Sequence, residues 1–180
     1  MFEAVVEESL VLRLLEPRHA GALFELMDRN RDSLGDWFPW VEGTKTVADS
    51  EAFIRESLSA FSAEGVFQLG IWLGDELAGV VGLQSISQFS RSTELYYWLG
   101  AKYRGHGLVT KACRYLCGHL FGELGLNRTE IRCAETNLKS RAVPERLGFV
   151  LEGTLREMGY TRDGWVDQRV YSLLKREWRG

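Results

Sequence analysis

Residues 97–112, with the sequence YWLGAKYRGHGLVTKA, join an aromatic strand to a helix through a loop that contains two closely spaced glycines. Gly105 and Gly107 let backbone N–H groups approach a ligand, and the helix that follows adds a partial positive charge at its N-terminus. A loop of this kind binds anions, most often phosphate. It lacks the Gly-Lys-Ser/Thr ending of a Walker loop and the third glycine of a dinucleotide fingerprint. The alternative is a tight turn that needs glycine only for its geometry.

Around this loop, the hydrophobic periodicity changes repeatedly between the strand and the helix pattern. The pattern predicts strands at residues 10–14, 66–73, 77–86, 94–99 and 129–134, and a strand pair over 149–174 that turns at 162–164. It predicts helices at residues 18–29, 47–63, 107–124 and 140–147. Thr46 and Asp49 form a capping box at the start of the second helix. We therefore expect an α/β (α+β) fold with a mixed sheet of about seven strands and helices on both faces.

The composition is that of one globular domain. The chain has 180 residues, 45% of them apolar and 26% charged, and shows no linker or repeat, so a single domain over residues 1–180 is expected. A net charge of −3 provides no global field for nucleic acid or an anionic membrane. No apolar stretch approaches the roughly 20 residues that span a bilayer, and the acidic start lacks signal-peptide features. With an odd number of cysteines, a cytoplasmic location is expected.

The cysteines are interpreted as core residues. Cys113 and Cys117 lie four residues apart on one predicted helix, but no histidine or acid at suitable spacing completes a ligand set. Cys133 falls in the middle of a predicted strand. Buried cysteine commonly acts as a small hydrophobic residue, so no metal site is expected.

Three segments resemble, in the same order along the chain, motifs of the GNAT family of N-acetyltransferases. Residues 104–109, RGHGLV, resemble the Arg/Gln-x-x-Gly-x-Gly/Ala loop that binds the pyrophosphate of acetyl-coenzyme A, with Val109 in place of the last small residue. Residues 137–149, NLKSRAVPERLGF, resemble the Asn-x-x-Ser…Leu-Gly-Phe segment. Residues 34–41, LGDWFPWV, resemble a Leu-x-x-Trp-x-Pro-Trp stretch beside the acceptor site of the bacterial ribosomal-protein branch (RimJ/RimL-like).

The resemblance implies the GNAT acyl-CoA N-acyltransferase fold, with a mostly antiparallel sheet, and acetyl-CoA as co-substrate without a metal. In that fold, the strand at residues 94–99 splays from its neighbour and leaves backbone N–H groups for the pantetheine arm. The residues expected to bind the cofactor are Trp98, Leu99, Arg104, Gly105, His106, Gly107, Leu108, Val109, Thr110, Asn137 and Ser140. Trp37 and Trp40 are expected to line the acceptor groove, since loops lie at the surface, and the alternative is that both belong to the core.

Acetyl transfer from a thioester needs a neutral amine, a stabilised oxyanion and a protonated leaving thiolate. Ser140 matches the family serine that donates to the thiolate, and its alternative role is to cap the helix after it. Asn137 is expected to position the pantetheine amide or a water, or else to shape the turn. Glu94 is the candidate base that accepts the proton of the amine, directly or through water. The alternative is that Glu94 is a solvated carboxylate at a strand edge without a catalytic role. Glu135 and Glu152 are weaker candidates.

The free energy of neutralising the amine favours an α-amine as acceptor. At pH 7, a lysine with a pKa of about 10.4 costs roughly 4.6 kcal/mol to neutralise, and an α-amine with a pKa near 8 costs about 1.4 kcal/mol. We therefore expect direct attack, in a ternary complex, by the N-terminal α-amine of a protein, a ribosomal protein in the resembled branch. The alternatives are a small amine such as a polyamine or aminoglycoside, and a CoA-binding module without catalysis. The preferred N-terminal residue, and whether a homodimer completes the groove, stay open.

Overall fold

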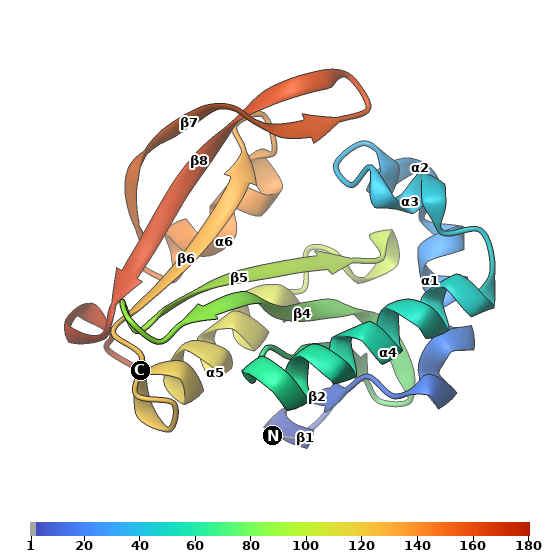
Figure 1. The fold of residues 1–180 in the computed structure, drawn as a ribbon, viewed down its shortest axis with the longest axis horizontal. Coiled ribbons are helices and arrows are strands. Elements are labelled where there is room, and N and C mark those ends of the chain that lie inside the picture. The colour runs from blue at the N-terminus through green and yellow to red at the C-terminus, as the bar shows by residue number, and fades with distance from the viewer. Residues whose placement is uncertain (1–2) are drawn as a thin grey trace.

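The computed structural model describes residues 3–180, whose strands form one eight-stranded sheet (Figure 1). The strands are β1 (Glu3–Glu7), β2 (Leu10–Leu14), β3 (Gln68–Leu73), β4 (Glu76–Ser87), β5 (Ser92–Leu99), β6 (Arg128–Ala134), β7 (Val150–Thr161) and β8 (Gly164–Leu174). The α-helices are α1 (Ala20–Arg29), α2 (Arg31–Gly35), α3 (Trp40–Gly43), α4 (Val47–Glu64), α5 (Leu108–Gly122) and α6 (Leu138–Arg146). Short 3-10 turns lie at Pro17–His19, Ala101–Tyr103 and Lys175–Glu177.

The sheet has the order β1-β2-β3-β4-β5-β6-β8-β7, and every neighbouring pair is antiparallel except β5 with β6. The mixed, mostly antiparallel sheet predicted from the sequence is thus confirmed, with eight strands rather than about seven. The additional strand is β1, an edge strand with the sequence EAVVE, in which only Ala4 is fully buried. An acidic, largely exposed strand gives no apolar alternation in the sequence.

Helices cover both faces of the sheet, as expected. Successive side chains of a strand point to opposite faces of the sheet. Tyr97 and Trp98 of β5 therefore point to different faces, and each contacts a helix that covers its face. The Tyr97 hydroxyl donates a hydrogen bond to the backbone oxygen of Ser140 in α6, at 3.0 Å. The Trp98 ring instead lies 6.1 Å, centroid to centroid, from the ring of Trp40 in α3. Two of these helices, α2 and α3, were absent from the sequence prediction because four or five residues are too few to show helical periodicity.

The sheet divides at its one parallel pair. β5 and β6 are paired only from Ser92 opposite Arg128 to Leu95 opposite Ile131, although both strands continue beyond this point. β6, β8 and β7 then rise away from β5 as an arch, seen in orange and red in Figure 1. The backbone of residues 96–99 is left without a ladder partner on that side, which is the splay that the GNAT resemblance implied.

The other local predictions concern the second helix and the cysteines. Asp49 N–H donates to Thr46 Oγ1 at 3.3 Å, and Thr46 N–H donates to Asp49 Oδ2 at 2.8 Å, so the predicted capping box starts α4. Cys113, Cys117 and Cys133 are buried, free core residues, as predicted. Burial raises the pKa of Cys117 to about 12, which leaves its thiol unreactive. Within residues 3–180, no helix is long and apolar enough to cross a membrane.

Candidate active site

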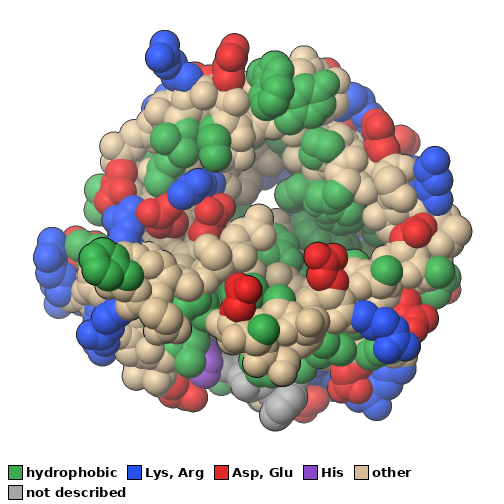
Figure 2. Space-filling view, viewed as in Figure 1, with side chains coloured by type: hydrophobic (Ala, Val, Ile, Leu, Met, Phe, Trp, Pro, Cys, Tyr) green, Lys and Arg blue, Asp and Glu red, His purple; other side chains and the backbone are tan. Residues whose placement is uncertain are grey.

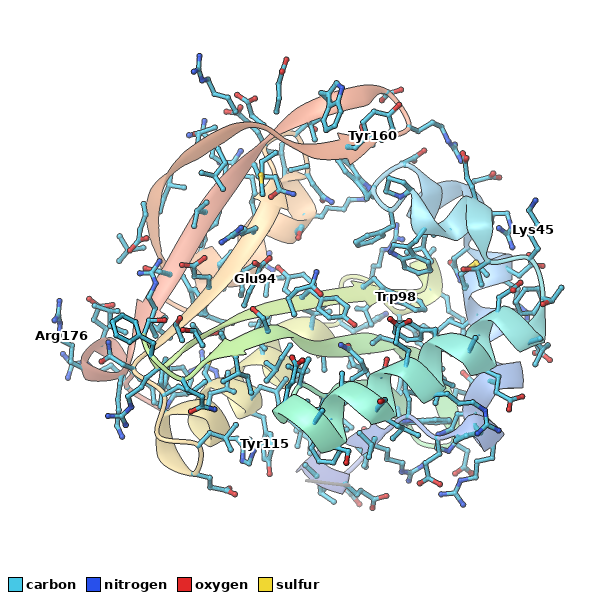
Figure 3. All side chains as sticks on the ribbon, viewed as in Figure 1. Lys45, Glu94, Trp98, Tyr115, Tyr160 and Arg176 are labelled. Atoms are coloured by element: carbon cyan, nitrogen blue, oxygen red, sulfur yellow. The ribbon has the colours of Figure 1, made fainter. Side chains whose placement is uncertain are left out.

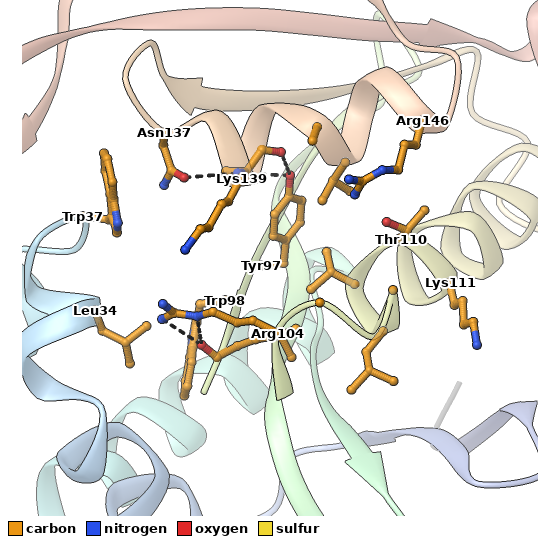
Figure 4. A pocket seen from close by; sticks show the side chains of 18 of the residues that line it. Leu34, Trp37, Tyr97, Trp98, Arg104, Thr110, Lys111, Asn137, Lys139 and Arg146 are labelled. Carbon is orange, nitrogen blue, oxygen red and sulfur yellow. Dashed lines mark hydrogen bonds between the residues drawn. The ribbon is translucent and has the colours of Figure 1, made fainter. Parts of the chain in front are cut away.

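A cavity of about 830 Å³ lies where β5 separates from β6, next to the first turns of α5 and α6 (Figure 4). Small-ligand sites have volumes on the order of 300–1,000 Å³, so this one suits an extended cofactor. Its walls come from the end of β5, the loop at residues 104–110, one side of α6, and the segment after α2. Figure 2 shows the same face hollowed below the β7–β8 arch, with hydrophobic side chains deep in the hollow on the side of α2 and α3.

The glycine loop has the geometry that an anion site requires. Gly105 and Gly107 have φ angles of +86° and +72°, in the left-handed region that other residues rarely adopt. A Cβ atom at either position would meet no protein atom within 4 Å, so the space before the backbone is open. Gly107 is the N-cap of α5 and offers no side chain to the first N–H groups of the helix. These donors are therefore available to a phosphate, as predicted for residues 104–110.

Four cationic side chains line the cavity, and no carboxylate does so among residues 3–180. Lys111 Nζ is paired with Glu7 Oε2 at 2.7 Å. The Arg104 guanidinium donates to the backbone oxygen of Leu99 at 3.3 Å and to Ser33 Oγ at 3.1 Å, so it holds the loop against β5 and α2. Lys139 and Arg146, both on α6, have no hydrogen-bond or ion-pair partner within the described chain.

The predicted motif residues Asn137 and Ser140 meet Tyr97 at the cavity wall. Asn137, not Ser140, is the N-cap of α6, because its Oδ1 accepts from Ser140 N–H at 3.1 Å. The alternative of Ser140 as helix cap was therefore wrong, and the helix begins earlier than predicted. The Ser140 hydroxyl lies 3.2 Å from Cys133 Sγ and 3.3 Å from the Tyr97 hydroxyl. The hydroxyl is the donor in both contacts, and its one proton could turn from these long contacts to a group in the cavity.

Tyr97 was missed as a functional residue. Burial raises the pKa of the Tyr97 phenol well above its ordinary value, so the phenol stays protonated and acts as a hydrogen-bond donor. The sequence shows only that Tyr97 alternates with Leu95 and therefore lies on the same, buried face of the strand. That pattern is typical of a core residue and does not indicate a functional role. Its partner Ser140 is 43 residues away in the chain, and no local pattern connects the two.

A second cavity of about 110 Å³ adjoins the first. Glu94 lies on the opposite face of β5 from Tyr97, toward the arch (Figure 3), and lines neither cavity. Burial raises the pKa of the Glu94 carboxyl. Arg132, whose Nε lies 3.3 Å from Glu94 Oε2, opposes that shift. Arg132 lines the smaller cavity, and Glu94 therefore contacts that cavity only through its ion pair with Arg132.

The two weaker base candidates are held in ion pairs. The Glu135 carboxylate is paired with Arg169. The Arg128 guanidinium, together with the Ser172 hydroxyl, lowers the pKa of Glu152 to about 2. A carboxylate that acidic takes up a proton poorly near neutral pH. Glu94 is also paired, with Arg132, but its pKa is raised rather than lowered, so it suits the role of a base better than Glu152 does.

The two tryptophans of the acceptor prediction lie in different surroundings. Trp37 lines both the large cavity and a smaller one of about 110 Å³ beside it. Trp40 lines neither; its ring packs 5.8 Å from that of Phe38 and remains 45% exposed. The two cavities meet at the residues that line both of them, which are Trp37, Phe38, Tyr97, Asn137 and Ser140.

The remaining predicted cofactor residues are mostly brought together. The cavity wall includes Trp98, Leu99, Leu108, Val109 and Thr110. His106 is exposed and does not line the cavity. One ion pair joins the β7–β8 turn to the segment after α2: Arg162 donates to Asp36 Oδ1 at 3.0 Å.

Comparison with known proteins identifies the family. Residues 9–150 match the family described as the acetyltransferase (GNAT) domain. The chain is a GNAT acetyltransferase. This GNAT protein is 39% identical to YdaF of Bacillus subtilis (strain 168), over 100% of the chain and 99% of YdaF. It is 27% identical to the ribosomal-protein-serine acetyltransferase of Escherichia coli (strain K12), over 94% of each chain.

A solved structure supports the cofactor. The microcin C7 self-immunity acetyltransferase MccE, in complex with acetyl-CoA and AMP, superposes with a TM-score of 0.89 at 30% identity over 94% of each chain. The GNAT protein described here is accordingly an acetyl-CoA-dependent N-acetyltransferase. Its own residues fit the cofactor, because the open space before Gly105 and Gly107, the uncapped start of α5 and the unpaired edge of β5 adjoin one cavity. Within residues 3–180, no group of three or more metal-ligating side chains is present.

Proposed function

We propose that this enzyme acetylates the N-terminal α-amine of a protein by direct attack on acetyl-CoA in a ternary complex. The observation that carries the proposal is the charge of the two cavities. Arginine and lysine are the only charged side chains that line them within residues 3–180. A polyamine or an aminoglycoside is a polycation and needs carboxylates for binding, whereas a protein N-terminus brings one amine on an otherwise neutral backbone.

The cavity geometry supports an ordered placement of the two substrates. The pyrophosphate of the cofactor would lie on the backbone of residues 105–110, and the pantetheine arm would follow the unpaired edge of residues 96–99. The thioester would then reach the wall shared by both cavities, where Tyr97 and Ser140 lie. The amine would enter from the smaller cavity, beside the apolar face of Trp37.

The reaction then needs two proton-handling groups. As the amine nitrogen attacks the thioester carbon, its proton would pass through water to Glu94. The C–S bond then breaks, and the Ser140 hydroxyl would stabilise the leaving thiolate by a hydrogen bond. Hydrogen bonds to charged groups contribute about 1.5–3 kcal/mol, so this contact alone would supply ten- to a hundredfold in rate.

A ribosomal protein is the acceptor class that we favour. The Escherichia coli relative is named as a ribosomal-protein-serine acetyltransferase and aligns with almost the whole chain. The smaller cavity, at about 110 Å³, offers room for little more than one small residue. An unstructured N-terminus that enters as a single extended strand meets this constraint.

The proposal is tested by free-thiol release from acetyl-CoA across a panel of acceptors. Peptides that copy ribosomal-protein N-termini should react, and polyamines and aminoglycosides should not. Preferential turnover of a polyamine would overturn the proposal. Trp37→Ala should raise the KM for the peptide and leave the Kd of coenzyme A unchanged. Trp165→Ala is the matched control, because Trp165 is 67% exposed on β8 and lines neither cavity.

A further inference from the structure

Lys139 is an exposed primary amine that lines the cofactor cavity. It is the second residue of α6 and lies between Asn137 and Ser140, both of which line the wall shared by the two cavities. Figure 4 shows its side chain extending from α6 into the cavity, away from the end where Thr110 and Lys111 lie. Its amine is thus directed away from the phosphate-binding loop and toward the side of the cavity where Trp37 lies.

The surroundings of Lys139 differ from those of the other lysines. Lys102 Nζ is paired with Glu76 at 2.8 Å, and Lys111 Nζ is paired with Glu7 at 2.7 Å. Lys45 and Lys175 are exposed, as Lys139 is, but they do not line the cavity. Only Lys139 combines a position in the cavity with the absence of an acidic partner in the described chain.

The position of Ser140 fixes where the reaction centre would lie relative to this amine. Consecutive Cα atoms are about 3.8 Å apart, so Lys139 is tethered next to the residue assigned to the leaving thiolate. A tethered amine is present at an effective concentration in the millimolar range or above, without any binding step. When no acceptor is bound, Lys139 is the lysine of residues 3–180 that lines the cofactor cavity without an acidic partner, so its amine can sample the space next to bound acetyl-CoA.

We propose that Lys139 is a self-acetylation site of this enzyme. In its neutral form, Lys139 Nζ attacks the thioester carbon of bound acetyl-CoA and forms an N–C bond. The C–S bond breaks, the proton lost by the nitrogen goes to the thiolate, and the products are Nε-acetyl-lysine and free coenzyme A. The modification removes one positive charge and adds an acetyl group inside the cavity. Acceptor turnover should fall, because the acetamide occupies part of the acceptor path.

The test uses the wild-type protein with saturating acetyl-CoA and no acceptor, after calorimetry has confirmed coenzyme A binding by the same preparation. Peptide mapping by mass spectrometry follows acetylation at each lysine over time. Lys139 should be acetylated roughly tenfold faster or more than Lys45 and Lys175, which report non-enzymatic acetylation. The rate at Lys139 should not change when the protein is diluted, because the reaction is intramolecular.

Two variants sharpen the result. Gly107→Val should slow acetylation at Lys139 and leave Lys45 unchanged, since only the first depends on bound cofactor. Lys139→Arg keeps the charge and should abolish the fast acetylation event. Equal rates at Lys139 and Lys45, or no acetylation at Lys139, would overturn the inference. A peptide acceptor assayed in parallel separates this failure from a failure of the proposed function, because the peptide can react while Lys139 does not.

Discussion

Replacement of Ser140 by alanine separates a catalytic contribution from a structural one. The hydroxyl makes only two long contacts, 3.2 Å to Cys133 Sγ and 3.3 Å to the Tyr97 hydroxyl, so its loss should destabilise the fold by less than about 1 kcal/mol. If the same hydroxyl stabilises the leaving thiolate, kcat should fall by about ten- to a hundredfold. The Kd of acetyl-CoA should change little.

Asn137→Ala is the matched control for stability. Asn137 caps α6 through its 3.1 Å contact with Ser140 N–H, and loss of an N-cap costs about 1 kcal/mol. In a chain of this length, that corresponds to a fall in Tm of roughly 2–4 °C. Thiol-release kinetics at saturating acetyl-CoA give kcat, and calorimetric melting gives Tm. A Ser140→Ala variant with wild-type kcat, or one whose Tm falls as far as that of Asn137→Ala, would refute the assignment.

Three further predictions follow from the loop and from the charged groups. Gly107→Val should weaken coenzyme A binding strongly in calorimetry, because the new side chain fills the open space before the loop. Gly148→Val is the control: Gly148 has a similar φ of +79° but does not line the cavity, so the variant carries the same backbone strain and should leave binding unchanged. The acid limb of the kcat/KM profile should lie above the ordinary glutamate pKa, because burial raises the pKa of Glu94. Arg132→Gln should move the acid limb to still higher pH, because it removes the positive charge beside Glu94. An acid limb that does not move in this variant would exclude Glu94 as the base. Since the pKa of Glu152 is held at about 2, its stabilising contribution is present above the ordinary glutamate pKa of about 4.3 and is lost as the pH falls toward 2. Glu152→Gln should flatten the fall of Tm over that range, and an unchanged slope would contradict the ion-pair reading.

The sequence predicted those parts of the fold that local patterns encode. The strand, glycine loop and helix at residues 97–112 lie as predicted, because positive φ angles at Gly105 and Gly107 and the apolar face of α5 are local properties. β1 was missed because an exposed acidic edge strand shows no alternation. The cap of α6 is Asn137 and not Ser140, for which capping was considered as an alternative role. Serine and asparagine are both common N-caps, and the sequence does not show at which residue the helix begins.

Contacts in the site between residues that are far apart in the sequence could not be predicted from local patterns. Arg104 was expected to serve the phosphate, but in the fold it holds β5 against α2 through Leu99 and Ser33. The Glu94–Arg132 pair joins two strands that are adjacent only through a parallel pairing. No periodicity in the chain indicates such a neighbour.

Mass spectrometry distinguishes acetyl transfer to an α-amine from transfer to a lysine side chain. The enzyme is incubated with acetyl-CoA and a peptide that carries a free N-terminus and an internal lysine, and in parallel with the same peptide blocked at its N-terminus. Fragmentation should place the acetyl group on the α-amine of the first peptide, and the blocked peptide should remain unmodified. Acetylation of the lysine ε-amine in either peptide, with the free α-amine untouched, would contradict the account.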